Sequence, residues 1–387
     1  NVDHGKTTLT QSLTGKWAAT HSEELKRGIT IRLGYADAVF YRCEKCGYTV
    51  SSKCDTCSGS AQPVRAVSFI DAPGHETLMA TVLSGASLMD GAVLVIAANE
   101  KCPQPQTSEH LKALDVIGIK NIVIAQNKID LVSEQRALES FKEIQSFVNE
   151  TVAEHAPIIP VSAINRVNIN VLIESIEKTI PTPPRDKARP AKFYIARSFD
   201  VNRPGTAISK LVGGVIGGSA VQGAIRRGDN VKIVPGANTD KGPIELETKV
   251  VNILHGTTEI SEATPGGLIA LQTELDPALT RGDGLVGSIA GDPEAVPKTL
   301  REMTIDVTLF DHVVGVKEVH TVKPIKKGDA LMMTVAIAKT VGLVTAAAKK
   351  RVTATLKLPV AAANGEKVAI SMQYGGRWHL VGYGVIV

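Results

Sequence analysis

Long apolar runs are missing from this sequence. No uninterrupted apolar stretch approaches the roughly 20 residues that a helix needs to cross a bilayer, and no signal peptide is recognisable, although position 1 need not be the true start of the protein. These absences argue against a membrane protein, and a cytoplasmic protein is the simplest interpretation. The length of 387 residues exceeds one typical hydrophobic core, so we expect two or three domains.

A strong overall charge is also lacking, since the chain carries a net charge of only +4 at pH 7. The charge is unevenly distributed: residues 299–387 contain twelve Lys or Arg and six Asp or Glu, which gives +6, and the preceding 298 residues sum to −2. A basic module at this end suits a polyanion such as RNA. A solvated basic face that only keeps the protein in solution is the alternative.

The first 180 residues alternate short apolar runs with longer stretches of helical spacing, a pattern typical of an α/β domain with crossover helices. Polar motifs follow directly on several of the apolar runs, at the edge where open α/β sheets bind ligands. The apolar runs predict the buried strands of a parallel sheet: Val67–Ile70, Ala92–Ala97, Ile122–Gln126 and Ile158–Val161. The intervening stretches predict helices: Thr107–Ile117, Glu134–Val152 and Ile169–Ile180.

Helical periodicity is absent from the second half of the chain. A segment punctuated by prolines, residues 183–192, predicts a stiff linker after a first domain at 1–182. Beyond it Val, Ile, Thr and Gly dominate, and short strands with regular turns predict two β-barrels, at 193–297 and 298–387. Glycine pairs that predict such turns recur at 213–214, 217–218, 266–267 and 375–376.

Two segments of this half are near copies, namely Ile225-Arg-Arg-Gly-Asp229 and Ile325-Lys-Lys-Gly-Asp329. Each copy is followed by an apolar stretch that predicts a strand, and the repeat supports the prediction of two barrels. Coincidence is the alternative, because Gly-Asp turns are common.

The chain opens with Asn1-Val-Asp-His-Gly-Lys-Thr-Thr8, the second half of a phosphate-binding loop of the form G-x-x-x-x-G-K-[ST]. The first glycine of that pattern would lie one residue before Asn1, so we expect a leading strand before the given sequence. Backbone N–H groups around Gly5 can wrap a phosphate at a helix N-terminus, and Lys6 would supply positive charge to the β- and γ-phosphates. The Thr7 hydroxyl would bind Mg²⁺, and the odd acid Asp3 makes sense if a second cation lies between it and the phosphates. The predicted phosphate-binding residues are Asp3, His4, Gly5, Lys6, Thr7 and Thr8.

Two further elements are typical of a site that binds a nucleoside triphosphate with Mg²⁺. Asp71 follows the apolar run Val67–Ile70, where its carboxylate can hold Mg²⁺ through water, and Gly74 lets the backbone approach the γ-phosphate. Thr30 is placed to reach Mg²⁺ and the γ-phosphate, so that loss of this phosphate would release its loop. Taken alone, these elements could be a Pro-Gly turn and a solvated hydroxyl, and the upstream phosphate loop favours the nucleotide role.

A fourth element is predicted to read the base. Asp130 of Asn127-Lys128-Ile129-Asp130 can accept two hydrogen bonds from guanine N1–H and its 2-amino group. Adenine lacks this donor pair, which is worth roughly 10⁴-fold in selectivity. Backbone N–H groups after the run Ile158–Val161 can support guanine O6, and the residues concerned are Ser162, Ala163 and Ile164. The order of these elements predicts a GTPase fold.

Cysteine is scarce, and four of the five cysteines lie within one short stretch. Two C-x-x-C knuckles separated by seven residues predict a tetrahedral zinc site of Cys43, Cys46, Cys54 and Cys57. No position is left for water, so this zinc is expected to be structural. An iron cluster and an empty site are the alternatives, and disulfides are not expected in a reducing compartment. Cys102 is interpreted as an ordinary small residue.

The strings VDHGKTTLT, KRGITI, DAPGHE, MDGAVLVIAANE, PQTSEH and NKID resemble those of translational GTPases, the family of elongation factor Tu. The chain is more similar still to the gamma subunits of archaeal and eukaryotic initiation factor 2. That resemblance rests on the inserted cysteine knuckle and on the segments His21–Arg27, Arg197–Asn202 and Arg377–Gly384, and it covers essentially the whole chain. The acid at Asp3 favours the archaeal form, while Asn1, where His is commoner, departs from the pattern.

This resemblance implies a GTP-binding domain followed by two β-barrels, the second of which docks an alpha subunit. It implies a heterotrimer with alpha and beta subunits that delivers initiator methionyl-tRNA to the small ribosomal subunit, with no DNA or membrane partner. It also implies that His75 orients the attacking water beside an apolar gate of Val2 and Ile29. Asp3 and the Gly28 carbonyl would bind the second cation. Hydrolysis is expected to be slow without ribosomal or partner stimulation.

Three alternatives remain open at this point. Elongation factor Tu itself is disfavoured by the cysteine knuckle, and a selenocysteine-specific relative by the absence of a C-terminal extension. A regulatory scaffold with a vestigial pocket is the third, and the intact residues Lys6, Asp71, His75 and Asp130 argue against it.

Overall fold

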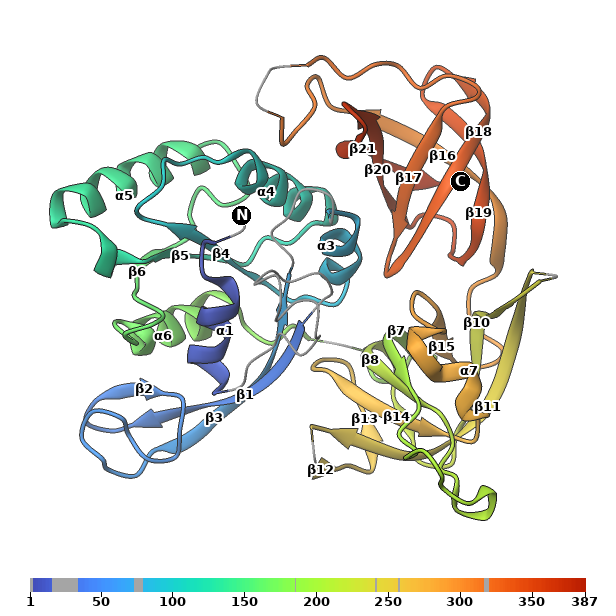
Figure 1. Cartoon of the computed structure of the whole chain (residues 1–387), viewed down its shortest axis with the longest axis horizontal. Helices are drawn as coiled ribbons and strands as arrows, with labels where there is room; N and C mark the ends of the chain where they lie inside the picture. Colours follow the sequence, from blue (N-terminus) through green and yellow to red (C-terminus); the bar gives the residue numbers. More distant parts are fainter. Residues whose placement is uncertain are drawn as a thin grey trace. The chain divides into compact units, whose positions relative to one another are not determined.

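The structure is a computed structural model that describes residues 3–15, 34–72, 79–184, 186–240, 242–256, 258–316 and 320–387 (Figure 1). The chain divides into two compact units. The first unit consists of Asn1–Pro183, Phe310–Val322 and Gln373–Val381. The second consists of Pro184–Leu309, Lys323–Met372 and Gly382–Val387.

A three-stranded parallel sheet forms the centre of the first unit, in the order β4 (Ala92–Ala97), β5 (Ile122–Asn127) and β6 (Ile158–Pro160). Successive side chains of a strand point to opposite faces, and both faces of these strands are apolar. Val95 and Val123 pack on one face against α1 (Lys6–Thr14) and α6 (Ile169–Thr179). Ile96 and Ile124 pack on the other against α4 (Pro105–Ile117) and α5 (Glu134–Val148). Each fully buried side chain of this size stabilises the fold by about 1.5–3 kcal/mol.

The helices differ from the sequence prediction at their ends. Helix α4 begins two residues before the predicted start because Pro105 occupies its first turn, where the missing N–H costs nothing. Helix α5 ends at Val148 instead of Val152, because Glu150 adopts a left-handed conformation with φ 58°. A further short helix, α3 (Met79–Ala86), precedes β4.

The strand predicted at Val67–Ile70 belongs to a separate antiparallel sheet, so its assignment to the parallel sheet was wrong. It lies within β3 (Gln62–Asp71), which pairs with β1 (Gly34–Cys43), and β1 also pairs with the short β2 (Gly47–Thr49). The link between β1 and β3 contains no crossover helix, and such a connection favours antiparallel pairing. The ladder runs from Gly34 opposite Asp71 to Arg42 opposite Gln62, and so spans the strand that carries the aspartate.

Six strands form the first barrel, closed where β10 pairs with β11. Its core is an apolar cluster that includes Phe193, Ile195 and Leu271, all fully buried. The ring runs β10 (Asn230–Thr239), β15 (Ile289–Gly291), β7 (Lys192–Phe199), β8 (Val215–Gln222), β14 (Ile269–Thr273) and β11 (Gly242–His255). Outside this ring, β12 (Thr258–Glu259) pairs with β11 in the antiparallel direction. β9 (Ile225–Arg226) and β13 (Glu262–Ala263) pair with each other in a separate ladder.

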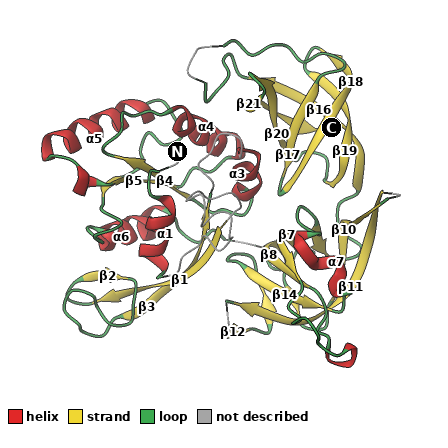
Figure 2. Cartoon of the chain, in the orientation of Figure 1, coloured by secondary structure: helices red, strands yellow, loops and turns green. Residues whose placement is uncertain are grey.

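Six further strands form the second barrel, which is also closed. Alternate residues such as Ile305, Met333 and Ile370 are fully buried inside it. Strand-rich structure dominates this half of the chain, whereas the longer helices belong to the first half (Figure 2). The ring runs β16 (Thr299–Leu309), β19 (Arg351–Ala361), β18 (Ala338–Ala348), β17 (Ala330–Val335), β20 (Lys367–Tyr374) and β21 (Arg377–Ile386).

The near-copied segments fold into the same turn in the two barrels. Gly228 and Gly328 both have φ 93°, a left-handed conformation that favours glycine. Their N–H groups donate to Val250 O at 2.7 Å and to Val344 O at 2.8 Å, respectively. In each turn the aspartate that follows the glycine accepts from a backbone N–H three residues earlier, at 2.7 Å. The two near copies therefore form the same turn, one in each barrel.

The glycine pairs do not all form turns. Gly375 and Gly376 have positive φ and lie between β20 and β21. Gly217 and Gly218, in contrast, lie inside β8, where a Cβ on Gly218 would collide with the carbonyl of Tyr194 on β7. The requirement for glycine there comes from the close approach of two strands, not from a turn.

Within the second unit the two barrels share an apolar contact made by Val234, Ile289 and Ala361, with Tyr194 packed against it. Lys192 Nζ lies 2.8 Å from Glu366 Oε1 beside this contact. Among the described residues, no helix has both the length and the apolar character required to cross a bilayer.

Candidate nucleotide-binding site and metal centre

The predicted phosphate loop leads directly into α1, which begins at Lys6. Gly5 precedes it with φ 84°, and a Cβ there would overlap the side-chain amide of Asn127, so glycine is required by both conformation and space. The first N–H groups of a helix have no partner within it and attract anions. This arrangement can therefore hold a phosphate at the start of α1.

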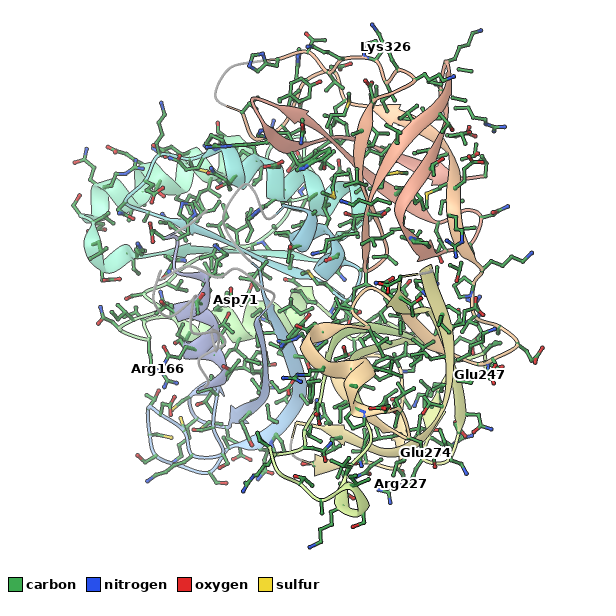
Figure 3. All side chains as sticks on the ribbon, turned by 45° about the vertical axis from the view of Figure 1, so that its right-hand side comes forward. Asp71, Arg166, Arg227, Glu247, Glu274 and Lys326 are labelled. Atoms are coloured by element: carbon green, nitrogen blue, oxygen red, sulfur yellow. The ribbon has the colours of Figure 1, made fainter. Side chains whose placement is uncertain are left out.

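Thr7 and Asp71, which are 64 residues apart in the sequence, meet beside this loop. The Thr7 hydroxyl donates a hydrogen bond to Asp71 Oδ2 at 2.6 Å, and Asp71 is the last, buried residue of β3 (Figure 3). Burial lowers the pKa of Lys6, and the charges of Asp71 and Asp3 oppose that shift. Hard oxygen ligands of this kind suit Mg²⁺, so the pair can hold that ion next to a phosphate.

Asn127 connects the phosphate loop to the loop after β6. Its Nδ2 donates to the main-chain carbonyl of His4 at 2.9 Å, and its Oδ1 accepts from the N–H of Ala163 at 3.0 Å. Asn127 is only 2% exposed, so both hydrogen bonds are shielded from water. The sequence predicted that this residue binds the nucleotide. The structure shows that its side chain joins the predicted phosphate loop to the loop after β6.

The residues predicted to read the base surround this connection. Lys128 adopts a left-handed conformation with φ 64°, which turns the chain into a short 3₁₀ helix (Ile129–Leu131) and leaves Asp130 exposed. Ser162 is fully buried and its Oγ accepts from the N–H of Asn165 at 3.3 Å, while the Ile164 side chain is exposed. An exposed carboxylate beside a rigid loop can receive the edge of a base.

Several predicted site residues lie outside the described part of the chain. They are Gly28, Thr30, Gly74 and His75, together with the gate residues Val2 and Ile29.

Glu100 is a residue of this site that sequence reasoning missed. Its Oε2 lies 3.2 Å from Nε2 of His4, while Nδ1 of the same ring lies 3.1 Å from the carbonyl of Val95. His4 is 1% exposed, and burial lowers its pKa. The only available signal was the string MDGAVLVIAANE, which ends in this glutamate.

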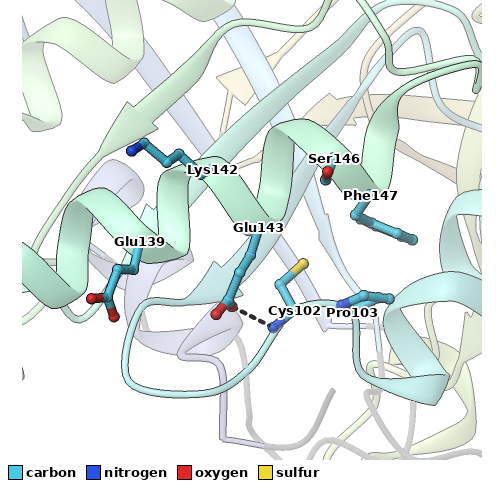
Figure 4. A pocket seen from close by; sticks show the side chains of 7 residues that line it. All are labelled: Cys102, Pro103, Glu139, Lys142, Glu143, Ser146 and Phe147. Carbon is cyan, nitrogen blue, oxygen red and sulfur yellow. Dashed lines mark hydrogen bonds between the residues drawn. The ribbon is translucent and has the colours of Figure 1, made fainter.

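A groove lies on the outer side of the same region, between α5 and the loop before α4 (Figure 4). The Glu143 carboxylate in its wall accepts a hydrogen bond from the N–H of Cys102 at 2.9 Å. Burial raises the pKa of the Cys102 thiol to about 12, in agreement with its interpretation as an ordinary buried residue. The groove is lined by Cys102, Pro103, Glu139, Lys142, Glu143, Ser146 and Phe147.

The four knuckle cysteines converge as predicted. Their sulfur atoms all lie within 4.8 Å of one another, and Sγ of Cys43 and Cys57 are 3.6 Å apart. Tetrahedral zinc with Zn–S bonds near 2.3 Å requires S–S separations of about 3.8 Å, so the cluster fits this ion. Hydrogen bonds from the N–H groups of Cys57 and Thr56 lower the pKa of Cys54 to about 6, which favours the thiolate that binds metal. A hydrogen bond with Cys57 raises the pKa of Cys46 to about 12, a shift that a bound dication would oppose.

Comparison with known proteins agrees with this geometry. A family model described as the elongation factor Tu GTP binding domain matches residues 1–182, and one described as initiation factor eIF2 gamma, C terminal, matches residues 301–386. Together with the fold, these matches define the class of the protein as a translational GTPase, which hydrolyses GTP and requires Mg²⁺.

Curated relatives indicate which kind of translational GTPase this chain is. Translation initiation factor 2 subunit gamma of Methanococcus vannielii is 53% identical over 100% of this chain and 96% of its own length. The Pyrococcus furiosus subunit of the same name is 53% identical over 100% of this chain and 95% of its own length. The chain belongs to the family of translation initiation factor 2 gamma subunits.

Solved structures share the fold at low sequence identity. A bacterial selenocysteine-specific elongation factor EF-Sec aligns with a TM-score of 0.74 and 24% identity, covering 100% of this chain and 56% of that chain. Elongation factor SelB from Methanococcus maripaludis, in complex with the GTP analogue GppNHp, aligns with a TM-score of 0.72 and 20% identity, covering 100% of this chain and 77% of that one. These similarities concern the fold alone.

Proposed function

We propose that this chain is the GTPase core of a translation initiation factor 2 heterotrimer with alpha and beta subunits, acting in the cytoplasm. In the GTP state it binds initiator methionyl-tRNA and delivers it to the small ribosomal subunit, and GTP hydrolysis releases it. The observation that carries the proposal is the 53% identity to gamma subunits over the whole chain. The Thr7–Asp71 contact supports its dependence on a nucleotide.

Binding of tRNA tests this proposal. We expect the heterotrimer with a non-hydrolysable GTP analogue to bind initiator methionyl-tRNA more tightly than elongator methionyl-tRNA, and the GDP form to bind both weakly. The measurement is a titration of labelled tRNA in each nucleotide state. Equal affinity for the two tRNAs would contradict the proposed role.

A second candidate function is that of an elongation factor Tu-like or selenocysteine-specific carrier of aminoacyl-tRNA. The fold that the chain shares with EF-Sec, at a TM-score of 0.74, is compatible with this function and does not by itself indicate it. Tighter binding of selenocysteyl-tRNA or of elongator aminoacyl-tRNA than of initiator tRNA in the same titration would establish this alternative.

For the nucleotide site we propose a division of labour among the predicted residues. The phosphates are bound by the loop from Asp3 to Thr8, and Mg²⁺ is held by Thr7, Thr30 and Asp71. When bound, Mg²⁺ neutralises charge on the β- and γ-phosphate oxygens. His75 orients the attacking water, and Asp3 with the Gly28 carbonyl holds a second cation. Guanine is read by Asn127, Lys128 and Asp130, and is supported by Ser162, Ala163 and Ile164.

For the cysteine cluster we propose a structural zinc ion. The four thiolates complete its coordination, so the ion holds the loop that links β1 to β3. The neighbouring ion pair between Arg166 and Asp55 at 3.0 Å joins this loop to the segment before α6. Both side chains are about half exposed, so the pair contributes little stability. The proposed metal therefore constrains the knuckle together with the β1–β2 ladder, and the ion pair adds little.

For the partners we propose that the first barrel, and not the second barrel as the resemblance implied, docks the alpha subunit. Its segment between β7 and β8 exposes Ile208 by 88% and Leu211 by 44%, with Val201 exposed by 49%. Clustered apolar side chains at a surface mark interaction sites. We also retain the division into a domain at 1–182, a linker at 183–192 and barrels at 193–297 and 298–387, which limited proteolysis of the isolated chain would test.

A further inference from the structure

Both nitrogen atoms of the buried His4 ring face oxygen atoms. Nδ1 faces the main-chain carbonyl of Val95 and Nε2 faces the Glu100 carboxylate, at 3.1 and 3.2 Å. The carbonyl of His4 itself accepts from Asn127, so the side chain and the main chain of this one residue are both anchored. His4 lies between Asp3 and Gly5, at the centre of the phosphate loop.

Glu100 is itself fixed from helix α5. Arg136 donates through one guanidinium nitrogen to the main-chain carbonyl of Glu100 at 2.9 Å, and it also binds the Glu143 carboxylate at 2.8 and 3.1 Å. Glu143 in turn accepts from the N–H of Cys102 at 2.9 Å. The backbone on both sides of residue 101 is therefore held against α5. We call the pair that makes these contacts the Arg136–Glu143 staple, and Glu143 and Cys102 also line the groove in Figure 4.

Charge-assisted hydrogen bonds of this kind are the stronger ones in proteins. The side chains of Arg136 and Glu143 are each only 27% exposed, so the staple is partly shielded from solvent. The guanidinium of Arg136 lowers the pKa of Glu143 and keeps it ionised. The staple therefore gives the loop that carries Glu100 one defined position.

We propose that Glu100 is a positioning residue for nucleotide binding, which holds the phosphate loop in its binding shape through the ring of His4 and is itself aimed by the Arg136–Glu143 staple. Glu100 acts through His4 and does not contact the nucleotide. This inference rests on the proposed role of residues 3–8 in binding the phosphates.

These contacts predict how the loss of Glu100 would affect the phosphate loop. Loss of the Glu100 carboxylate removes the group that faces Nε2 of a buried ring, and removal of a hydrogen-bond partner from a buried polar group is costly. The ring then turns or takes up water, and the His4 carbonyl no longer meets Asn127 in the same geometry. The N–H groups around Gly5 that face the phosphate lose their fixed arrangement, so the nucleotide dissociates faster.

The test compares Glu100→Ala with Glu100→Gln in the full chain, by stopped-flow dissociation of fluorescent GDP and of a fluorescent GTP analogue. We expect Glu100→Ala to raise both dissociation rates about tenfold. Glu100→Gln restores nearly the original rates, because its amide offers an acceptor oxygen and a donor NH₂ and can satisfy either protonation form of the ring. Hydrogen exchange of the loop around His4 provides a second readout, with faster exchange in Glu100→Ala only.

Two controls separate the possible outcomes. Glu154→Ala removes an exposed acid after α5 and leaves both rates unchanged. Lys6→Ala tests the phosphate loop itself, and retained nucleotide affinity in this variant overturns the proposed site. If Lys6→Ala loses the nucleotide while Glu100→Ala keeps the original dissociation rates, the positioning role alone is wrong. If Glu100→Ala and Glu100→Gln lower the melting temperature equally and accelerate dissociation equally, Glu100 has only a general structural role.

Discussion

The side-chain amide of Asn127 donates a hydrogen bond to the main-chain carbonyl of His4 across 123 residues of sequence, at 2.9 Å. The bond joins the loop that begins α1 to the strand end that carries the base-reading motif. Two elements predicted separately, one for phosphate and one for guanine, are therefore joined directly by a buried hydrogen bond. A change on either side of this contact is expected to affect both parts of the nucleotide.

Replacement of Gly5 by alanine tests this contact. A Cβ at Gly5 would overlap the Asn127 amide and would also be strained at φ 84°, so we expect a loss of GTP and GDP affinity of at least tenfold and a lower free energy of unfolding. Gly15→Ala is the matched control, because Gly15 has φ 69° and none of the described residues places an atom within 4 Å of its Cβ position. It should lose about 1 kcal/mol of stability but retain nucleotide affinity. Equal affinity losses in the two variants would rule out the steric mechanism.

Replacement of Asp130 by asparagine tests the base-reading role. An amide presents a donor to the additional carbonyl of xanthine, so we expect the preference of the protein to shift from guanine towards xanthine nucleotides. Competition between GDP and XDP in a fluorescence displacement assay measures the shift. Unchanged selectivity for GTP would contradict the assigned role of this exposed carboxylate.

Replacement of His75 by alanine tests the proposed positioning of water. We expect GTP binding to be unchanged and hydrolysis stimulated by the ribosome to slow, because loss of the water-positioning group removes part of the transition-state alignment. Single-turnover hydrolysis on ribosomal complexes measures the rate. An unaltered rate with normal GTP binding would exclude His75 as the water-positioning residue.

Removal of zinc tests the cysteine cluster. We expect one zinc ion per chain by atomic absorption, loss of the ion in Cys54→Ser, and full retention in the control Cys102→Ser, since Cys102 lies outside the cluster. Chelation should increase hydrogen exchange in residues 43–57 while nucleotide affinity changes little, because the ion is structural. Loss of GTP binding after removal of zinc, with Mg²⁺ kept in excess, would instead place the zinc in the nucleotide site.

The buried carboxyl of Glu109 makes stability depend on pH. Burial raises its pKa to about 7, partly offset by the N–H of Leu380, which donates to Oε1 at 3.3 Å within the first compact unit. Because the raised pKa belongs to the folded state, the neutral form stabilises the fold fully below the ordinary value of 4.5, and this stability is lost as pH rises to about 7. The loss is on the order of 3 kcal/mol.

Glu109→Gln should remove this dependence, because an amide stays neutral at every pH. We expect the variant to unfold at a denaturant concentration that varies less between pH 4.5 and 7, and to be the more stable protein above pH 7. Urea unfolding at a series of pH values measures the effect. Parallel curves for the two proteins would mean that Glu109 is ionised in the folded state.

Local signals in the sequence predicted the central strands, whereas the end of α5 and the pairing of β3 were not predicted. Strands such as Ala92–Ala97 were predicted with their bounds, because a continuous apolar run buried on both faces is a local signal. The end of α5 was missed by four residues, because a left-handed residue at Glu150 leaves no mark in the hydrophobic period. The direction of β3 was also missed, since alternation along a strand does not reveal which strand lies beside it.

The sequence by itself determined which residues carry the predicted chemistry: the glycine, lysine and threonine at the start of α1, the Asn-x-x-Asp motif that begins at the last residue of β5, and the paired cysteines. These features depend on residue types at short spacing, which the covalent chain fixes directly. Only the tertiary structure decided that Asn127 meets His4, that Thr7 meets Asp71 and that Glu100 faces the His4 ring. These partners lie 64 to 123 residues apart, and packing of helices on both faces of the sheet brings them together.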